Sequence, residues 1–414
     1  MQSLSPVQHN EREIFMDMLR GFAILGIFIA NLGSGFSFYD ESLQHTGPYL
    51  LPGWDHKMRF LHAMFIEGKF YSIFSLLFGW GIALQVKRGL AKDIDVTPTL
   101  KRRLTFMLLL GACHLLLWSG DIVFFYALLG FVLLPLRKFS NKALLISGGI
   151  LILSPILLYG LKLAFPVLNF PSELLNYTGM QVSSAVSHIK SEGEWFNLMK
   201  NGSWWEIVKL NVGGFFFRYG DLFFISRISK VLGMFLVGYV IGRSDFYKNI
   251  AQYKKIIYGV IAYGLLIAIP ANYILAHYMM WYSMDYYSLK INGLYQTIAY
   301  AFGVAPLALS YVGVLMLCSQ TAVGKKILSV FAPVGKMAFS NYILQTLVGS
   351  FVFLGAGLGY MQQVGPVCFT IFGISIFCVQ ILISSLWLKY FNFGPLEWLW
   401  RSYTYKQWQV MRKG

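Results

Sequence analysis

Charged residues are scarce in this sequence of 414 residues: Asp, Glu, Lys and Arg together make up 13%, while 57% of the residues are hydrophobic. Soluble domains average about 25% charged residues. This shortage excludes an ordinary soluble domain and predicts a polytopic membrane protein. Aromatic residues, at 17%, stand near the ends of the apolar runs, as in the interfacial belts of membrane helices.

Cysteine is also rare, with four residues, Cys113, Cys318, Cys368 and Cys378. All four lie within apolar runs and none has C-x-x-C spacing, so we expect small buried hydrophobic side chains rather than disulfides or zinc ligands. No metal site is predicted.

The formal net charge of +16 comes from 34 basic and 18 acidic residues. The basic residues form short clusters between apolar runs rather than one basic domain, which disfavours nucleic acid as a partner. Their placement instead indicates how the chain is oriented in a lipid bilayer.

Ten apolar runs are long enough, or nearly so, to cross about 30 Å of hydrocarbon. They predict an all-α, polytopic bundle of about ten transmembrane helices. The third and fourth are short and are joined through Ser119, Gly120 and Asp121, which predicts a helical hairpin. The runs cover residues 14–36, 58–86, 101–118, 121–136, 142–165, 219–242, 255–277, 292–319, 328–357 and 364–390.

Ten spans place the main Lys and Arg clusters on one side, which predicts cytoplasmic N- and C-termini by the positive-inside rule. Residues 1–390 would form the bundle, with 166–218 as an outer interfacial lid or spacer. Residues 391–414, in which aromatics alternate with Arg and Lys, predict a cytoplasmic amphipathic tail.

The first span carries a polar stripe within DMLRGFAILGIFIAN. Arg20 and Asn31 are eleven positions apart, so they lie about 20° apart around a helix, and Asp17 falls on the same face. This stripe either lines a polar cavity or contains an Asp-Arg pair that only anchors the helix end. We expect the cavity lining to include all three residues.

His114 is the one histidine deep in a predicted span, and imidazole is suited to exchanging a proton near neutral pH. Asp121 follows seven residues later and could hydrogen-bond to it only if Gly120 turns the chain back. The alternative is that His114 is a structural hydrogen-bond donor.

Further polar residues in the apolar runs are candidates for binding a substrate or cofactor. Such residues either serve function or join helices. The run RYGDLFFISRISK carries Arg218 and Asp221 as well as a cationic pair suited to a phosphate or carboxylate, or to neutralising Glu67 and Asp17. The candidates are Glu67, Lys69, Arg102, Arg103, the pair Arg227 and Lys230, Asn341 and Gln345.

Several segments together resemble the YeiB-type family of bacterial inner-membrane proteins, which is named for a domain of unknown function. They span nearly the whole chain: DMLRGFAILGIFIAN, KFYSIFSLLFG, RRL with GACH, GDIVFFYALLG, PVGKMAFSNYILQ and FGPLEWLWRSYTY. This family is regarded as a remote relative of transmembrane acyltransferases that include heparan glucosaminide acetyltransferase. Asp17, Arg20, Gly21 and Asn31 match the shared first-span pattern, but no H-x-x-W motif follows.

The resemblance implies an enzyme of the bacterial inner membrane that moves an acetyl-like acyl group from cytoplasmic acyl-coenzyme A to a hydroxyl or amine acceptor. Arg20, Arg102 and Arg103 would bind the coenzyme, His114 with Asp121 would act as general base, and Asn31 or Asn341 would stabilise the oxyanion. The acceptor would be a small molecule, lipid or glycan. The alternative is a secondary transporter of a small anionic or zwitterionic solute. The sequence does not determine the oligomeric state.

Overall fold

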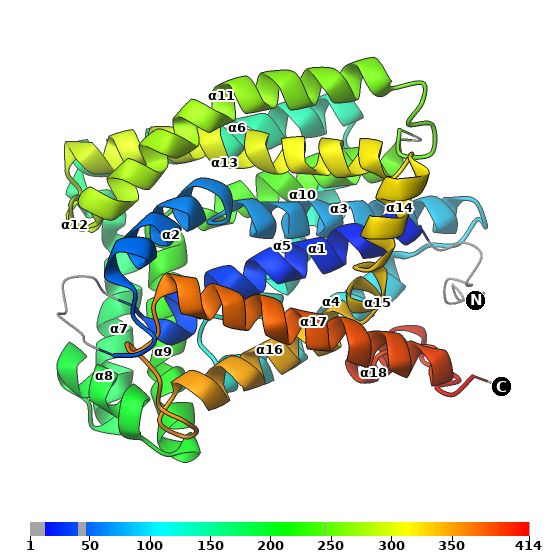
Figure 1. Cartoon of the computed structure of the whole chain (residues 1–414). Coiled ribbons are helices and arrows are strands. Elements are labelled where there is room, and N and C mark those ends of the chain that lie inside the picture. Colours follow the sequence, from blue (N-terminus) through cyan, green and yellow to red (C-terminus); the bar gives the residue numbers. More distant parts are fainter. Residues whose placement is uncertain (1–12, 40–46, 245, 414) are drawn as a thin grey trace.

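The computed structural model describes residues 13–39, 47–244 and 246–413, and within these ranges the chain is a bundle of helices without any strand (Figure 1). The predicted all-α class is therefore confirmed. The helices and helical turns are α1 (Ile14–Asn31), η2 (Leu32–Ser37), α2 (Pro52–Phe65), α3 (Lys69–Leu90), α4 (Thr97–Leu117), α5 (Val123–Leu136), α6 (Asn141–Ala164), η3 (Pro166–Asn169), α7 (Phe170–Ser187), α8 (Glu192–Asn201), α9 (Trp204–Phe224), α10 (Arg227–Arg243), α11 (Lys254–Trp281), α12 (Ser283–Tyr287), α13 (Ile291–Cys318), α14 (Ala322–Ser329), α15 (Ala332–Lys336), α16 (Ala338–Phe353), α17 (Pro366–Tyr390) and α18 (Pro395–Tyr405).

Each of the ten predicted spans contains a long helix, namely α1, α3, α4, α5, α6, α10, α11, α13, α16 or α17. By length and hydropathy alone, six segments of the described chain can cross a membrane, and a seventh is the pair α9 and α10, bent by 71°. α5 and α16 are apolar but shorter. The chain is thus a helical membrane protein, while the number ten and the cytoplasmic side of its ends stay predictions.

The basic clusters gather at one end of the bundle, drawn at the right in Figure 1, which we call the basic end. Three contacts among its loops show the grouping. Arg137 donates a 2.5 Å hydrogen bond to Thr97 Oγ1, Arg243 donates to the carbonyl of Phe139 at 2.8 Å, and Arg102 Nε donates to the carbonyl of Thr404 at 2.9 Å. The other end, formed by α2, α7, α8 and α12, is called the opposite end.

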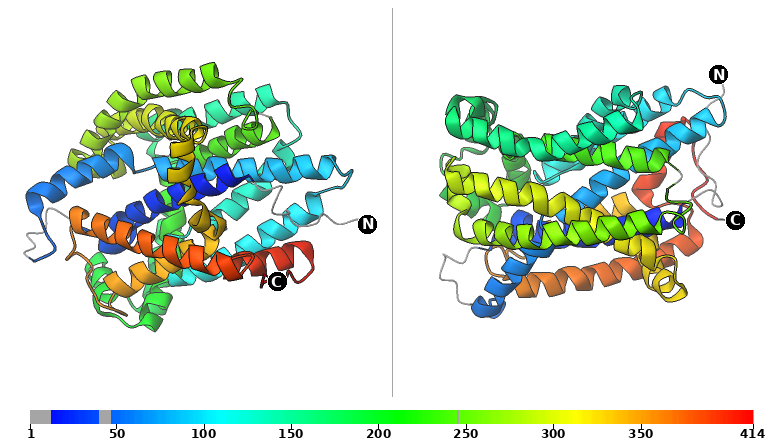
Figure 2. Two further views of the ribbon diagram at one scale, coloured as in Figure 1. Left: turned by 45° about the vertical axis from the view of Figure 1, so that its right-hand side comes forward. Right: turned by 90° about the horizontal axis from the view of Figure 1, so that it is seen from above.

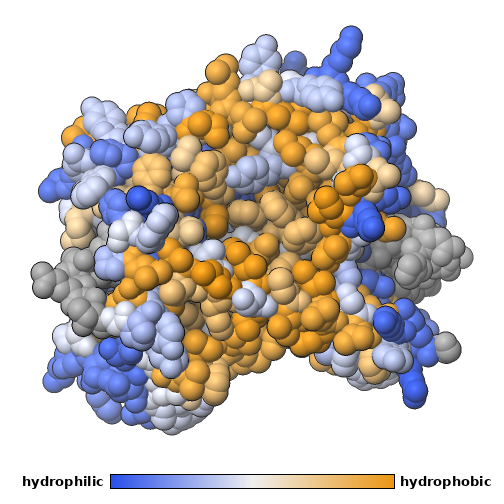
Figure 3. Space-filling model, viewed as in Figure 1, coloured by the Kyte–Doolittle hydropathy of each residue, from blue (hydrophilic) through white to orange (hydrophobic). Residues whose placement is uncertain are grey.

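Between these two ends the surface in Figure 3 is mainly apolar. Large apolar side chains are exposed on several helices there, for example Ile150, Leu266 and Leu382, at 63%, 71% and 64%. Such a band would meet water in a soluble protein but meets lipid in a membrane protein. The cysteines are free, but Cys113, Cys318 and Cys378 are exposed, so the prediction that all four are buried is wrong.

The first helix is held by a close approach of backbones rather than by its polar stripe. A Cβ on Gly335 of α15 would lie 1.8 Å from the carbonyl oxygen of Asp17, and one on Gly21 would lie 2.1 Å from that of Phe331. Glycine is needed at both positions because any side chain would separate the helices. The motifs DMLRGF and PVGK therefore meet each other.

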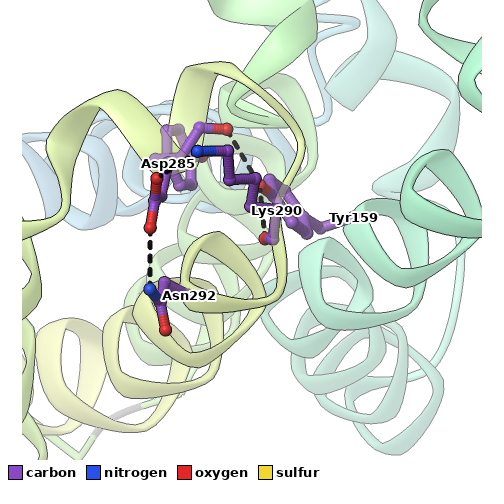
Figure 4. Close-up of polar contacts among 5 residues, drawn as sticks. Tyr159, Asp285, Lys290 and Asn292 are labelled. Carbon is purple, nitrogen blue, oxygen red and sulfur yellow. Dashed lines mark hydrogen bonds and ion pairs between the residues drawn. The ribbon is translucent and has the colours of Figure 1, made fainter.

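Helices α11 and α13 run side by side along the bundle (Figures 1 and 2), and their connection is tied to α6. Tyr159 of α6 donates to the carbonyls of Tyr286 and Lys290, at 2.8 and 3.3 Å. Asp285 accepts hydrogen bonds from Lys290 Nζ at 3.0 Å and from Asn292 Nδ2 at 2.7 Å (Figure 4). These polar contacts fix the loop at the opposite end.

Candidate functional site

A cavity of about 1090 Å³ lies at the opposite end of the bundle. It is lined by the last turns of α1, the α2–α3 and α4–α5 connections, the middle of α9 and the start of α10, and it is covered by α7 and α8. The covering segment belongs to residues 166–218, for which the sequence predicts a lid or spacer. Ser191 and Ser203 cap α8 and α9, and Ser203 with Glu206 forms a full capping box.

Four charged side chains line one part of this cavity: Glu67, Arg218, Asp221 and Arg227. Arg218 Nη1 lies 3.9 Å from Asp221 Oδ2, and the guanidinium of Arg227 lies 4.8 Å from the ring centre of Tyr71. Arg227 is within electrostatic reach of Glu67 and Asp221. We call these four residues the charged pole of the cavity.

Two breaks in helices bring the charged pole together. Gly68, with φ of +82°, ends the α2–α3 connection and leaves Glu67 outside both helices. Ser226, with φ of +52°, separates α9 from α10 at the 71° bend, so that Arg227 begins α10. Both residues occupy the left-handed region, which only Gly adopts without cost. The run predicted at 219–242 is therefore divided by the 71° bend, whereas 58–86 falls within one candidate span, Pro52–Leu90, with a turn between α2 and α3.

His114 and Asp121 form the hydrogen-bonded pair that the hairpin prediction allowed. His114 Nδ1 lies 2.7 Å from Asp121 Oδ2, and both residues are buried, at 2% exposure each. The second carboxylate oxygen accepts from the backbone N–H of Phe124 at 2.7 Å and thereby caps α5. His114 lies in the last turn of α4 rather than mid-span, and its Nε2 is buried with no hydrogen-bond partner.

Trp118 contacts both this pair and the cavity. Its ring lines the cavity, lies edge-on to the His114 ring with centroids 6.2 Å apart, and stacks on Phe36 at 4.9 Å. Its Nε1 donates to the carbonyl of Gly35 at 3.2 Å. The imidazole is thus one aromatic side chain away from the cavity.

The polar stripe of the first helix does not line a single cavity, so this prediction is wrong. Asn31 lines the cavity, but Asp17 and Arg20 do not. Asp17 is buried near the start of α1, where Arg20 Nη1 donates to it at 2.9 Å, at the basic end. The stripe is so long that Asp17 and Arg20 lie at the basic end of the bundle while Asn31 lies at the opposite end.

Two of the predicted cationic residues have structural contacts instead of a place in the cavity lining. Lys69 is fully buried and donates to the carbonyl of Ala63 at 2.7 Å, which joins α3 to the end of α2. Lys230 lies 4.0 Å from the ring centre of Tyr300. The residue that accompanies Arg227 in the cavity is Arg218 rather than Lys230.

Arg102 and Arg103 lie at the basic end, where α4 meets α18. The guanidinium of Arg103 covers the ring of Trp400 at 4.2 Å, and its carbonyl accepts from Trp400 Nε1 at 3.1 Å. Arg20 and Arg401 are close enough to Arg103 for their positive charges to repel it. Several arginines therefore converge at this end.

Asn341 and Gln345 join α16 to α17 and do not line the cavity. Asn341 Nδ2 donates to Ser384 Oγ at 3.0 Å, and Gln345 Nε2 donates to Gln380 Oε1 at 2.9 Å. Gln380 Nε2 returns a hydrogen bond to the carbonyl of Asn341 at 3.0 Å. We call these four residues the amide network. Of the two roles expected for polar residues in the apolar runs, function or joining helices, the second accounts for all of these contacts.

Our choice of candidates from the sequence misses Arg218, Asp221, Trp118 and Tyr71 as cavity residues. Arg218 and Asp221 are visible in the run RYGDLFFISRISK, but a continuous helix gives no reason to prefer Arg218 to Lys230. The aromatic pair is not distinguishable from packing residues. Within the described residues, no group of three or more His, Cys, Asp or Glu side chains could hold a metal ion.

The fold and the site together define a helical membrane protein with a large cavity at one end of the bundle, charged in one part and mainly apolar in the rest, and a buried His-Asp pair beside it. The family described as "Protein of unknown function (DUF418)" matches residues 241–407.

Three relatives match nearly the full length of the chain. The uncharacterized protein YxaH of Bacillus subtilis is 31% identical over 100% of this chain and 99% of its own length. The uncharacterized protein YeiB of Escherichia coli is 28% identical over 95% and 96%. The uncharacterized 39.9 kDa protein in the amylase 3' region of Bacillus acidopullulyticus is 27% identical over 98% and 97%. The chain belongs to this YeiB-type DUF418 family. No solved structure matches.

Proposed function

We propose that the protein is an acyltransferase of the bacterial inner membrane. It would transfer an acetyl-like group from cytoplasmic acyl-coenzyme A to a hydroxyl or amine acceptor held in the cavity. The observation that carries this proposal is the buried His114–Asp121 pair, with Nδ1 held by the carboxylate at 2.7 Å and Nε2 left without a partner. A base oriented by a carboxylate is the arrangement used to activate weak nucleophiles.

The proposed chemical step moves one proton and one acyl group. His114 Nε2 takes the proton of the acceptor O–H or N–H as its O or N attacks the thioester carbonyl. The new ester or amide bond forms, the C–S bond breaks, and the leaving thiolate is protonated from the imidazolium. Asp121 keeps Nδ1 protonated and stabilises the imidazolium. His114 does not line the cavity, so a neighbouring side chain, such as the cavity-lining Trp118, would have to move to admit the acceptor to Nε2.

The coenzyme would bind at the basic end, where Arg20, Arg103 and Arg401 lie close to one another. Phosphate groups favour arginine because the guanidinium can donate two parallel hydrogen bonds. Along α4 the rise from Arg102 to His114 is about 18 Å, which the pantetheine arm would have to bridge. Asn31, one of the amides that line the cavity, would donate a hydrogen bond to the oxyanion. Asn341 is engaged in the amide network and is not proposed for the oxyanion.

The test is transfer by the purified, full-length protein in vesicles of bacterial total lipid extract, supplied with radiolabelled acetyl-coenzyme A. We expect thiol release together with label in the lipid or glycan fraction. His114→Gln keeps a hydrogen bond but cannot exchange a proton in this pH range, and it should lower the rate by about 10² to 10⁴. His277→Gln, on an exposed position of α11 outside the cavity lining, is the matched control.

Full activity of the His114→Gln variant, or absence of acetyl-coenzyme A binding and cleavage by the wild type, would refute the proposal. In the second case the transport alternative is preferred. The bend of 71° between α9 and α10, with Arg227 at the start of the second helix, favours it because discontinuous helices form solute sites in transporters. Uptake of a labelled zwitterionic solute such as phosphoethanolamine into the same vesicles would then be the measurement.

A further inference from the structure

The cavity has two chemically different parts. The charged pole is formed by Glu67, Arg218, Asp221 and Arg227, and the other charged lining residues, Lys190 and Glu192, belong to the covering segment. Most of the remaining wall is apolar or aromatic, and includes Ile27, Phe70, Phe125, Met180, Phe217 and Val231. A small ion or sugar would not need a cavity of about 1090 Å³ with this much apolar wall. A cavity with one charged part and an otherwise mainly apolar wall suits an amphiphilic ligand.

Both arginines of the charged pole have an unused donor. Nε of Arg218 and Nε of Arg227 are buried and have no hydrogen-bond partner among the residues that the structure describes. A buried donor without an acceptor costs about 1–3 kcal/mol, a cost that an oxygen of a ligand in the cavity would relieve once the guanidinium turns toward it. Arg227 is within electrostatic reach of Arg218, and two forked guanidinium groups in one cavity match a group with several oxygens, such as phosphate.

The carboxylates of the charged pole do not neutralise these arginines by close pairing. Within the described residues, the one ion pair among the four is Arg218–Asp221, with a single contact at 3.9 Å. Glu67 lies in electrostatic reach of Arg227 without being within 4.0 Å of it. The charged pole therefore offers two cationic and two anionic groups. Charge complementarity favours a ligand that carries both signs.

We infer that the cavity binds a phospholipid with a zwitterionic headgroup, its phosphate facing Arg218 and Arg227, its ammonium facing Glu67 and Asp221, and its hydrocarbon along the apolar wall. This inference rests on the proposed function, because it names the acceptor class: a headgroup with a primary ammonium, as in phosphatidylethanolamine. That ammonium would first lose one proton to a carboxylate of the charged pole, and the resulting amine has the lone pair and the N–H that the acyl step requires. The start of α10 adds partial positive charge beside the phosphate.

The experiment is native mass spectrometry of the delipidated full-length protein in detergent, titrated with defined probes in the absence of acetyl-coenzyme A. The probes are dioleoyl-phosphatidylethanolamine, dioleoyl-phosphatidylglycerol, dioleoylglycerol and water-soluble phosphoethanolamine. We expect phosphatidylethanolamine to bind at least ten times more tightly than dioleoylglycerol, which lacks the phosphate, and than phosphoethanolamine, which lacks the chains. Phosphatidylglycerol should bind with intermediate affinity, because it lacks the ammonium.

Variants assign the binding to the charged pole. Arg227→Ala and Arg218→Ala should each weaken phosphatidylethanolamine about tenfold, and Arg227→Lys should weaken it less because it keeps the charge but loses the fork. Glu67→Gln should abolish the preference for phosphatidylethanolamine over phosphatidylglycerol. Arg59→Ala is the control, since Arg59 lies in α2 at the same end but does not line the cavity. Arg227→Lys also serves if an alanine variant does not fold.

Equal binding of dioleoylglycerol, or unchanged binding by the arginine variants, would overturn the inference. Equal binding of phosphoethanolamine would overturn it too and would indicate a small-solute site. Failure here is distinguishable from failure of the proposed function, because the titration needs no turnover. Lipid binding without acetyl transfer refutes only the proposed acyltransferase function. Transfer to a water-soluble acceptor without lipid binding refutes only the inference that the ligand is a lipid.

Discussion

The charged pole of the cavity and the amide network are both polar regions inside one apolar bundle, and they differ in how fully their groups are paired. In the amide network, Asn341, Gln345 and Gln380 donate to one another or to the neighbouring helix, and Oε1 of Gln345 is the group left over. In the charged pole, two arginine donors have no partner and the one ion pair is long.

This difference separates two uses of polar residues that look alike in the sequence. Amides that bond to each other hold helices together and leave little for a ligand. Buried cations with free donors are a cost to the fold, and such a cost is kept where it serves binding or chemistry. The comparison can be tested by substitutions that separate activity from stability.

The largest effect should come from the His114–Asp121 pair beside the cavity. Asp121→Asn keeps an acceptor for the backbone N–H of Phe124 but removes the charge that orients and stabilises the imidazole. Acetyl transfer should fall by about 10² or more, with little change in thermal unfolding in detergent. Asp121→Ala, which loses both roles, should reduce activity and stability together. An equal loss of stability in both variants would make the pair structural, like the amide network.

A smaller effect, on stability alone, is expected in the amide network. Gln380→Leu leaves Gln345 Nε2 and the Asn341 carbonyl without their partners, so it should lower the free energy of unfolding by about 1–3 kcal/mol. The double variant Gln345→Leu, Gln380→Leu should recover part of that loss, because both partners become apolar. Unfolding in detergent measures the difference. A loss of acetyl transfer in folded protein would contradict the structural role.

The charged pole should respond in the opposite way. Arg218→Gln removes a cation whose ion pair is long, so the free energy of unfolding should change by about 0–1 kcal/mol, while binding of phosphatidylethanolamine weakens. Parallel unfolding and lipid titrations of this variant and of Gln380→Leu give the contrast directly. A destabilisation as large as that of Gln380→Leu would remove the distinction between the two regions.

The smallest effect is expected in the loop between α11 and α13 at the opposite end. There the carboxylate of Asp285 accepts two hydrogen bonds but is close to solvent. Hydrogen bonds from Asn292 and Lys290 hold the pKa of Asp285 below its ordinary value. Because the pKa of Asp285 is lower in the folded state, its carboxylate stabilises the fold above the unfolded pKa, near 3.9. This stabilisation is lost as the pH falls through the pKa of the folded state. The protection factors of the α12 amides, in which the intrinsic slowing of exchange in acid is divided out, should therefore fall below about pH 4 in the wild type.

Asp285→Asn is the control for that measurement. It should show faster exchange at neutral pH and should lose the acid dependence, because the amide does not titrate in this range. An unchanged acid dependence in this variant would assign the effect to another group. Acetyl transfer should be the same as in the wild type, since Asp285 does not line the cavity.

Much of the fold and part of the site could be predicted from local sequence. The apolar runs predict the helices, and Ser119, Gly120 and Asp121 predict the hairpin that returns Asp121 to His114. The charged pole could not be predicted, because it depends on helix breaks. Hydropathy over 58–86 and 219–242 is continuous, and nothing in it requires the left-handed backbone at Ser226. Without that break, Arg227 and Lys230 look like equivalent neighbours on one face.

The membrane class, the helices and the positions of the basic clusters could be inferred from the sequence, because they follow from hydrophobicity and charge along the chain. Which polar residues face one another depends on how the helices pack. Asp17 and Asn31 share a helix face yet belong to opposite ends, and Asn341 and Gln345 meet Ser384 and Gln380 instead of a ligand. The reason is physical: the partner of a buried polar group is set by the contacts between helices, which residues far apart in the chain make together.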